Sequence, residues 1–312
     1  MKRILITGGA GYIGSLLSDT LVNQGYEVTV IDNLFFNKNT IGHLIIKKNF
    51  KFIHADVRNS IITNEEIKKN DIIIPLACLV GAPLCDKYPN DALEINQDVI
   101  VDMINKKSKN QIILYPNTNS GYGTTKKNVE CDEKMDLNPI SVYGKTKCMV
   151  ENKLMEKENV VSFRLATVFG SSFRNRIDLL VNYFVYNAIM NNKLVLFEPK
   201  FRRNYIHIRD IVNTFIFTIE NFQKLKNNIF NVGLSSANLT KIDLCNKIKK
   251  YITSFRFEVS EEGTDPDKRD YFVSNKKIES MGWKPKVTLD EGIIELSQVY
   301  RLINNSDFDK NI

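Results

Sequence analysis

This chain has few of the residues that build metal sites and no stretch suited to a membrane span. Histidine occurs only three times in 312 residues, and the five cysteines form no C-x-x-C pair. This scarcity argues against a structural zinc site, so we predict that no metal is bound. Unpaired thiols indicate a reducing cytoplasm as the location. No apolar run is long enough to cross a bilayer, and we therefore expect no association with membranes.

The basic surplus of the chain lacks the pattern typical of nucleic-acid-binding proteins. The formal net charge is +7, but the lysines occur in short groups such as 47–48 and 106–107. Nucleic-acid-binding faces usually carry a denser basic patch. We expect no nucleic-acid partner, and the surplus would instead attract an anionic substrate.

A glycine-rich turn follows the first apolar segment. Residues 4–6 are apolar and precede Gly8, Gly11 and Gly14, which are spaced three apart; a helical pattern then runs to Gly25. Glycines let the backbone approach phosphates closely, and a helix N-terminus offers unpaired N–H groups. Strand, turn and helix together predict a dinucleotide pyrophosphate site.

An acidic residue ends the second β-rich segment. Asp32 closes residues 27–32 and lies 18 positions beyond Gly14. A carboxylate at this distance would accept hydrogen bonds from the adenosine ribose and repel the 2′-phosphate of NADP, so NAD is the predicted cofactor. The alternative is an ordinary surface acid at a strand end.

Alternating strand and helix patterns predict an α/β fold, a Rossmann-like doubly wound parallel sheet. The predicted strands are 3–7, 27–32, 51–55, 71–76, 111–116 and 160–165. The predicted helices between them are 11–24, 40–48, 90–107 and 143–158.

Beyond residue 166 the pattern loosens and predicts a smaller, mixed α/β substrate-binding lobe. The helices and strands expected in this region are 177–191, 194–197, 205–207, 209–221, 229–232, 240–251 and 289–303. Those around 205–233 are expected to return to the large sheet. We assign 1–167 and about 205–236 to the NAD-binding domain, 168–204 and 237–305 to the lobe, and 306–312 to a frayed tail.

Tyr143 and Lys147 share one face of the helix predicted over 143–158, because they lie four residues apart. A nearby ammonium group would lower the tyrosine pKa toward neutrality, and the tyrosine could then serve as a general base for a hydroxyl that NAD oxidises. Thr118, in the polar loop after strand 111–116, could hydrogen-bond the reacting oxygen. An ordinary exposed helix pair is the alternative interpretation.

These motifs resemble the extended short-chain dehydrogenase/reductase superfamily, and in particular its nucleotide-sugar epimerase/dehydratase branch. The likeness continues through R-N-Y-I-H-I-R-D at 203–210, D-K-R-D-Y at 267–271 and G-W-K-P at 282–285. It spans the chain to about residue 300.

The resemblance implies roles for the matching residues. The implied NAD ligands are Gly8, Gly11, Tyr12, Ile13, Gly14, Asp32, Asn33, Asp56, Val57, Leu76, Ala77, Cys78, Asn96, Tyr143 and Lys147. The implied catalytic set is Thr118, Tyr143 and Lys147. The implied contacts of a nucleotide-diphosphate sugar are Val80, Thr118, Asn119, Leu196, Arg203 and Arg269, where the two arginines would clamp the diphosphate. Helices 90–107 and 143–158 would pair two copies into a homodimer through a helix bundle.

Departures from the branch narrow the predicted chemistry. The 4,6-dehydratases carry an Asp-Glu pair after the catalytic threonine, where this chain has Asn119 and Ser120. Neither side chain is a useful acid or base near neutral pH, which disfavours elimination. The glutamate of related decarboxylases and the cysteine of GDP-fucose-forming epimerase-reductases are missing too. The chemistry that these departures leave is oxidation at C4 of the sugar, with or without return of the hydride to the opposite face.

Three segments, 79–85, 117–123 and 164–170, resemble the GDP-D-glycero-D-manno-heptose C4 dehydrogenases of bacterial capsule and surface-polysaccharide pathways. We therefore predict NAD-dependent oxidation of such a sugar to its 4-keto form. A 4-epimerase similar to UDP-glucose 4-epimerase stays open as an alternative. A non-catalytic NAD-binding protein is less favoured, because binding alone requires no Tyr–Lys pair.

Overall fold

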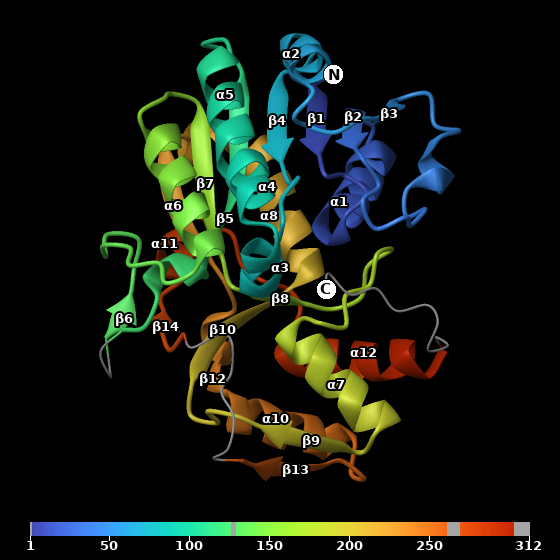
Figure 1. Cartoon of the computed structure of the whole chain (residues 1–312), viewed down its shortest axis with the longest axis vertical. Helices are drawn as coiled ribbons and strands as arrows, with labels where there is room; N and C mark the ends of the chain where they lie inside the picture. The colour runs from blue at the N-terminus through green and yellow to red at the C-terminus, as the bar shows by residue number, and fades with distance from the viewer. Residues whose placement is uncertain (1, 126–128, 261–268, 303–312) are drawn as a thin grey trace.

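The computed structural model describes residues 2–125, 129–260 and 269–302. The tail 306–312 and positions 267–268 of the C-terminal motif lie outside these ranges. In Figure 1 a large sheet with its helices forms the upper part of the molecule, and a smaller lobe lies below it. Within the described ranges, every helix is too short or too polar to cross a membrane.

Seven parallel strands form the large sheet, in the order β11-β7-β5-β4-β1-β2-β3. Their bounds are β1 (Arg3–Thr7), β2 (Glu27–Asp32), β3 (Phe50–His54), β4 (Ile72–Pro75), β5 (Ile112–Thr118), β7 (Val160–Leu165) and β11 (Asn228–Val232). This arrangement confirms the predicted doubly wound fold. The chain order reverses between β1 and β4, and such a switch point opens a crevice at the carboxyl ends of the strands.

Two helix layers cover the two faces of this sheet (Figure 1). One layer contains α1 (Tyr12–Asn23) and α8 (Ile208–Glu220); the other contains α2 (Ser60–Lys69), α5 (Val99–Lys106) and α6 (Val142–Met155). In β1, Ile4 packs in one core with Phe215 of α8. The next residue, Leu5, packs in the other core with Met103 of α5 and Leu154 of α6. Successive strand side chains point to opposite faces, so a sheet buried on both faces requires a continuous apolar run.

The smaller lobe combines short sheets with three helices around a core of its own. Its strands are β8 (Thr167–Phe169), β10 (Arg202–His207) and β12 (Asn238–Thr240) in one sheet, with β9 (Lys193–Leu196) and β13 (Arg256–Val259) in another. Its helices are α7 (Leu180–Met190), α10 (Lys241–Tyr251) and α12 (Leu289–Leu302). The remaining strands and α-helices are β6 (Glu130–Cys131), β14 (Phe272–Val273), α3 (Ala82–Lys87), α4 (Pro89–Leu93), α9 (Phe222–Leu225) and α11 (Lys276–Ser280).

Two expectations differ from the structure. The helix predicted over 40–48 is wrong, because only a 3-10 turn, Gly42–Leu44, forms there. Leu44 packs in the core, whereas Ile46 is 86% exposed, so the apolar residues do not continue along one helical face. The segment 205–236, assigned to the large domain, is divided. Strand β10 pairs with β8 and β12 in the lobe, whereas α8 packs on the large sheet and β11 joins its edge.

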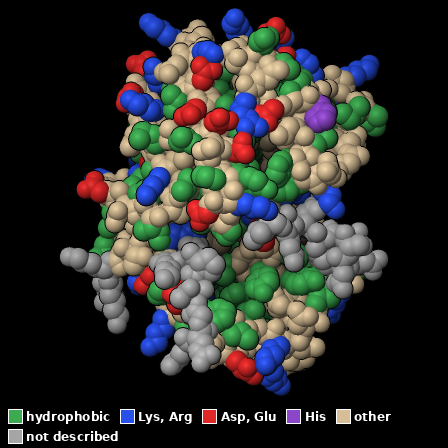
Figure 2. Space-filling model, viewed as in Figure 1, with side chains coloured by type: hydrophobic (Ala, Val, Ile, Leu, Met, Phe, Trp, Pro, Cys, Tyr) green, Lys and Arg blue, Asp and Glu red, His purple; other side chains and the backbone are tan. Residues whose placement is uncertain are grey.

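Charges of both signs are interspersed on the face seen in Figure 2, where acidic side chains lie among lysines and arginines over the large sheet. All five cysteines are free thiols. The described ranges contain no cluster of three or more His, Cys, Asp or Glu side chains that could hold a metal ion.

Candidate active site

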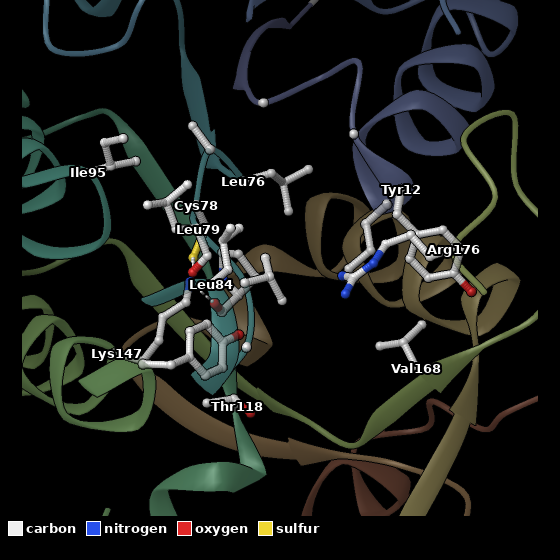
Figure 3. A pocket seen from close by; sticks show the side chains of 18 of the residues that line it. Tyr12, Leu76, Cys78, Leu79, Leu84, Ile95, Thr118, Lys147, Val168 and Arg176 are labelled. Atoms are coloured by element: carbon white, nitrogen blue, oxygen red, sulfur yellow. Dashed lines mark hydrogen bonds between the residues drawn. The ribbon is translucent and has the colours of Figure 1, made fainter. Parts of the chain in front are cut away.

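A cavity of about 870 Å³ lies where the carboxyl edge of the large sheet meets the lobe. Most of the predicted site residues line it: Gly8, Gly11, Tyr12, Ile13, Gly14, Asp32, Asn33, Asp56, Val57, Leu76, Ala77, Cys78, Val80, Thr118, Tyr143, Lys147, Arg203 and Arg269. In Figure 3, Thr118 and Lys147 lie on one side of this cavity, across from Tyr12 and Arg176.

The glycine turn between β1 and α1 packs closely against other backbone segments. Gly8 has a φ of +72°, and a Cβ atom on it would lie 2.5 Å from the backbone nitrogen of Ala77. A Cβ atom on Gly14 would overlap the carbonyl oxygen of Gly8. Only glycine fits both positions, and the turn delivers the N-terminus of α1 to the cavity. This cradle fits a dinucleotide pyrophosphate.

Acidic side chains mark the end of the cavity beside β2. Asp32 accepts hydrogen bonds from the backbone N–H groups of Ala10 (2.9 Å) and Leu34 (2.8 Å), and burial raises the pKa of its carboxyl. Asn33 donates to Asp56 at 3.2 Å. The guanidinium of Arg58 hydrogen-bonds Asp56 and lowers the pKa of that carboxyl. This corner suits ribose hydroxyls better than a phosphate.

A loop of the lobe closes over the glycine turn. Tyr12 donates its phenolic proton to the carbonyl of Gly170 (2.7 Å), and Ser172 donates to the carbonyl of Tyr12 (2.7 Å). From the same loop, Arg176 reaches the cavity and is held by Asp178 through its Nε atom (3.1 Å). Sequence reasoning missed Ser172 and Arg176, because only the fold brings this loop to α1.

Strand β5 and helix α6 position the predicted catalytic side chains. Thr118 is the last residue of β5, and Tyr143 and Lys147 lie in the first turns of α6. Lys147 is buried, with Nζ donating to the carbonyl of Pro116 (2.8 Å) and lying 4.7 Å from the centroid of the Tyr115 ring. Burial lowers the pKa of Lys147.

Burial is the main influence on the pKa of Tyr143, and the expected lowering by Lys147 stays a prediction. Burial raises the pKa of Tyr143 well above its usual range, and the thiols of Cys78 and Cys85 add to the rise. Arg269 and Arg176 oppose the rise. The cations that favour the phenolate here come from the lobe.

A buried network supports the loop that carries Thr118. Glu151 of α6 accepts hydrogen bonds from Asn117 (2.7 Å), Ser162 (2.6 Å) and Arg164 (2.7 Å). The Asn117 amide oxygen accepts from the backbone N–H of Thr118 at 2.8 Å. The Glu151 carboxylate therefore orients the side-chain amide of Asn117, and that amide in turn holds the backbone of Thr118.

Three predicted ligands lie outside the cavity lining, and their direct roles stay predictions. Asn96, in the π-helical turn Glu94–Asp98, donates to the carbonyl of Leu79 (2.9 Å) and accepts from its N–H (2.8 Å), so it braces a lining segment. Asn119 is fully buried, and neither amide atom has a hydrogen-bond partner among the described residues. Leu196 is 1% exposed and packs in the core of the lobe.

Cationic side chains gather where the lobe faces the cavity. Arg203 is buried, with its guanidinium 5.5 Å from the centroid of the Tyr271 ring. Lys241, which sequence reasoning missed, lines the same cavity and donates to the carbonyl of Phe197 at 2.9 Å. With Arg269, these groups suit a diphosphate.

Comparisons with known proteins agree with this architecture. Residues 4–233 match the model of the NAD dependent epimerase/dehydratase family. The chain is 27% identical to the protein named "Putative UDP-glucose 4-epimerase" of Methanocaldococcus jannaschii, over 93% of this chain and 95% of that protein. It is 30% identical to UDP-glucuronic acid decarboxylase 3 of Arabidopsis thaliana, over 96% and 89% of the two chains. The solved structure of dTDP-glucose 4,6-dehydratase from Bacillus anthracis, in complex with NAD, superposes with a TM-score of 0.84 at 20% identity, covering 99% of each chain.

Proposed function

This chain belongs to the NAD-dependent epimerase/dehydratase family, and from that premise we propose that it oxidises the C4 hydroxyl of a nucleotide-diphosphate sugar. One observation carries the proposal: a single cavity is lined by the glycine cradle and by Thr118, Tyr143 and Lys147. A binding protein would need only the cradle. Family membership makes NAD the cofactor, and Gly8, Gly14 and Asp32 would hold it.

In the proposed reaction Tyr143 takes the proton of the sugar O4 hydroxyl while Thr118 hydrogen-bonds the same oxygen. NAD supplies the hydride acceptor when it is bound. Because burial raises the pKa of Tyr143, its phenolate needs cationic support, which Arg269 and Arg176 give. Lys147 keeps its Nζ on the carbonyl of Pro116 and so orders the end of β5 beside the phenol.

We propose GDP-D-glycero-D-manno-heptose as the substrate and its 4-keto form as the product. The support is the likeness of segments 79–85, 117–123 and 164–170 to the dehydrogenases of that sugar. Asn119 and Ser120 stand where dehydratases need acids, which argues against loss of water. Arg203 and Arg269 would bind the diphosphate through bidentate hydrogen bonds.

A 4-epimerase is the second candidate, and the archaeal relative favours it, since that protein is named for this activity and matches nearly end to end. Both candidates share the first oxidation. They differ in whether the hydride returns to C4.

A panel assay separates the candidates. The purified protein is incubated with NAD and either GDP-D-glycero-D-manno-heptose or UDP-glucose, with and without a keto acid as oxidant. NADH absorbance and the NMR spectrum of the product are followed. A 4-keto sugar supports the dehydrogenase, and a C4 epimer without net NADH supports the epimerase. A 4-keto-6-deoxy product, or no turnover of either sugar, would overturn the proposal.

We also propose a homodimer that pairs through α5 and α6. Met149 of α6 is 47% exposed, and it lines a shallow pocket with Val101 and Asn105 of α5. By contrast, Met103 and Leu154 point into the core. Light scattering of the wild type and of Met149→Glu tests this: the wild type should be dimeric and the variant monomeric.

A further inference from the structure

A serine that the proposed reaction does not use lies directly against Thr118. Ser120 belongs to the 3-10 turn Asn119–Tyr122, is 4% exposed and lines the cavity. Its hydroxyl oxygen is 2.8 Å from Thr118 Oγ1, and its backbone N–H donates to the same oxygen at 3.1 Å. Thr118 thus receives two contacts from one residue.

The contacts from Ser120 limit the hydrogen bonds that the hydroxyl of Thr118 can still make. A threonine hydroxyl has one proton to donate and two lone pairs that accept. The N–H of Ser120 takes one lone pair of Thr118. If the hydroxyl of Ser120 donates a hydrogen bond to the second lone pair, Thr118 can bind a molecule in the cavity only by donating its hydroxyl proton.

Exposure favours this direction of the hydroxyl–hydroxyl bond. Thr118 is only partly buried and faces the cavity at the end of β5, whereas Ser120 is almost fully buried. The carbonyl of Ser120 accepts from the N–H of Gly123 at 3.2 Å, which fixes the turn that holds its side chain. We infer that Ser120 is a positioning residue, which orients the hydroxyl proton of Thr118 toward the substrate oxygen.

This inference rests on the proposed function and sharpens it. With both lone pairs filled, Thr118 can donate a hydrogen bond to the sugar O4 but cannot accept its proton. The proton must therefore go to Tyr143. Ser120 thus restricts Thr118 to hydrogen-bond donation and leaves proton acceptance to Tyr143. The hydroxyl of Ser120 itself is neither an acid nor a base near neutral pH.

A double-mutant cycle tests the inference. We would measure kcat, KM and thermal unfolding for Ser120→Ala, Thr118→Val, the double variant and Ser120→Thr, using whichever of the two panel sugars the wild type converts. Loss of one oriented hydrogen bond should lower kcat of Ser120→Ala by about 5–10-fold with little change in KM. Thr118→Val should lower kcat by about 100-fold. Ser120→Thr keeps the hydroxyl and should recover most of the loss.

The decisive comparison is made in the Thr118→Val background, where Ser120→Ala should cause no further loss of kcat. An equal loss in both backgrounds would mean that Ser120 does not act through Thr118, and the inference would be overturned. It would also be overturned if Ser120→Ala had wild-type kcat, or if it lost as much as Thr118→Val. Wild-type kcat in Thr118→Val would instead refute the proposed function, so the two failures are distinguishable.

Discussion

The two sides of the cavity are built in different ways. We call Gly8, Gly14 and Asp32 the cofactor wall. It depends on backbone shape. Gly8 lies against the backbone of Ala77 with no room for a Cβ atom. Asp32 accepts hydrogen bonds from the backbone N–H groups of Ala10 and Leu34.

We call Thr118, Tyr143 and Lys147 the catalytic wall, and it depends on buried side-chain charge. Lys147 is buried against a carbonyl oxygen, and the loop that carries Thr118 is fixed by the carboxylate of Glu151. Substitutions should therefore act through steric fit on the cofactor wall and through lost polar partners on the catalytic wall. Four predictions test this division.

The largest effect should come from Tyr143→Phe, which removes the proposed base without changing the shape of the cavity. We expect kcat to fall by about 10²–10⁴-fold, with NAD affinity unchanged. Since the pKa of Tyr143 is raised, wild-type turnover should also increase with pH above neutrality, and the variant should lack this rise. Steady-state rates and calorimetric NAD titration measure both. Full activity in the variant would rule out the base.

The next largest effect should come from Glu151→Ala, which leaves the guanidinium of Arg164 buried and without its carboxylate partner. Breaking a buried ion pair costs about 3–5 kcal/mol. Glu156→Ala is the matched control on the same helix end, because its bond to Lys153 is exposed and should be worth less than about 1 kcal/mol. Urea unfolding of both variants gives the two values. Equal losses would show that the network under the catalytic wall is not essential.

The same division explains what could be predicted from the sequence. The cofactor wall was predictable because turn, strand and helix are neighbours in the chain. The support of the catalytic wall was not, since Asn117 and Glu151 are 34 residues apart and their pairing depends on how β5 and α6 pack. The role of Asn96 likewise depends on a π-helical turn that no periodicity reveals. The helix expected over 40–48 does not form, because Leu44 is buried in the core while Ile46 faces solvent, and the segment needs only one 3-10 turn to place them.

On the cofactor wall, Gly8→Ala can be compared with Gly25→Ala. Both glycines have positive φ, +72° and +89°, but a Cβ atom on Gly25 would meet nothing within 4 Å. Gly25→Ala should cost only the backbone strain, about 1 kcal/mol, and leave NAD binding intact. Gly8→Ala should cost about 2–3 kcal/mol and abolish NAD binding, because the new methyl group pushes against the turn. If both variants bind NAD equally well, steric fit is not what this wall supplies.

The smallest effect should come from the ion pair of Asp56 and Arg58, which lines the cavity beside the cofactor wall. The hydrogen bond from Arg58 lowers the pKa of Asp56 from its ordinary value of 3.8, so the folded chain keeps this carboxylate charged at a pH where the unfolded chain is protonated. The resulting stabilisation is complete above 3.8 and is lost as the pH falls through the lower, folded value. Both side chains are about one-third exposed, so Asp56→Asn should cost less than about 1 kcal/mol at neutral pH. The difference between wild type and variant, measured by urea unfolding across the acid range, should vanish at the lowest pH and shrink in high salt. A difference that stayed constant with pH could not arise from the charge of Asp56. It would mean that this substitution, like Gly8→Ala, acts through steric fit.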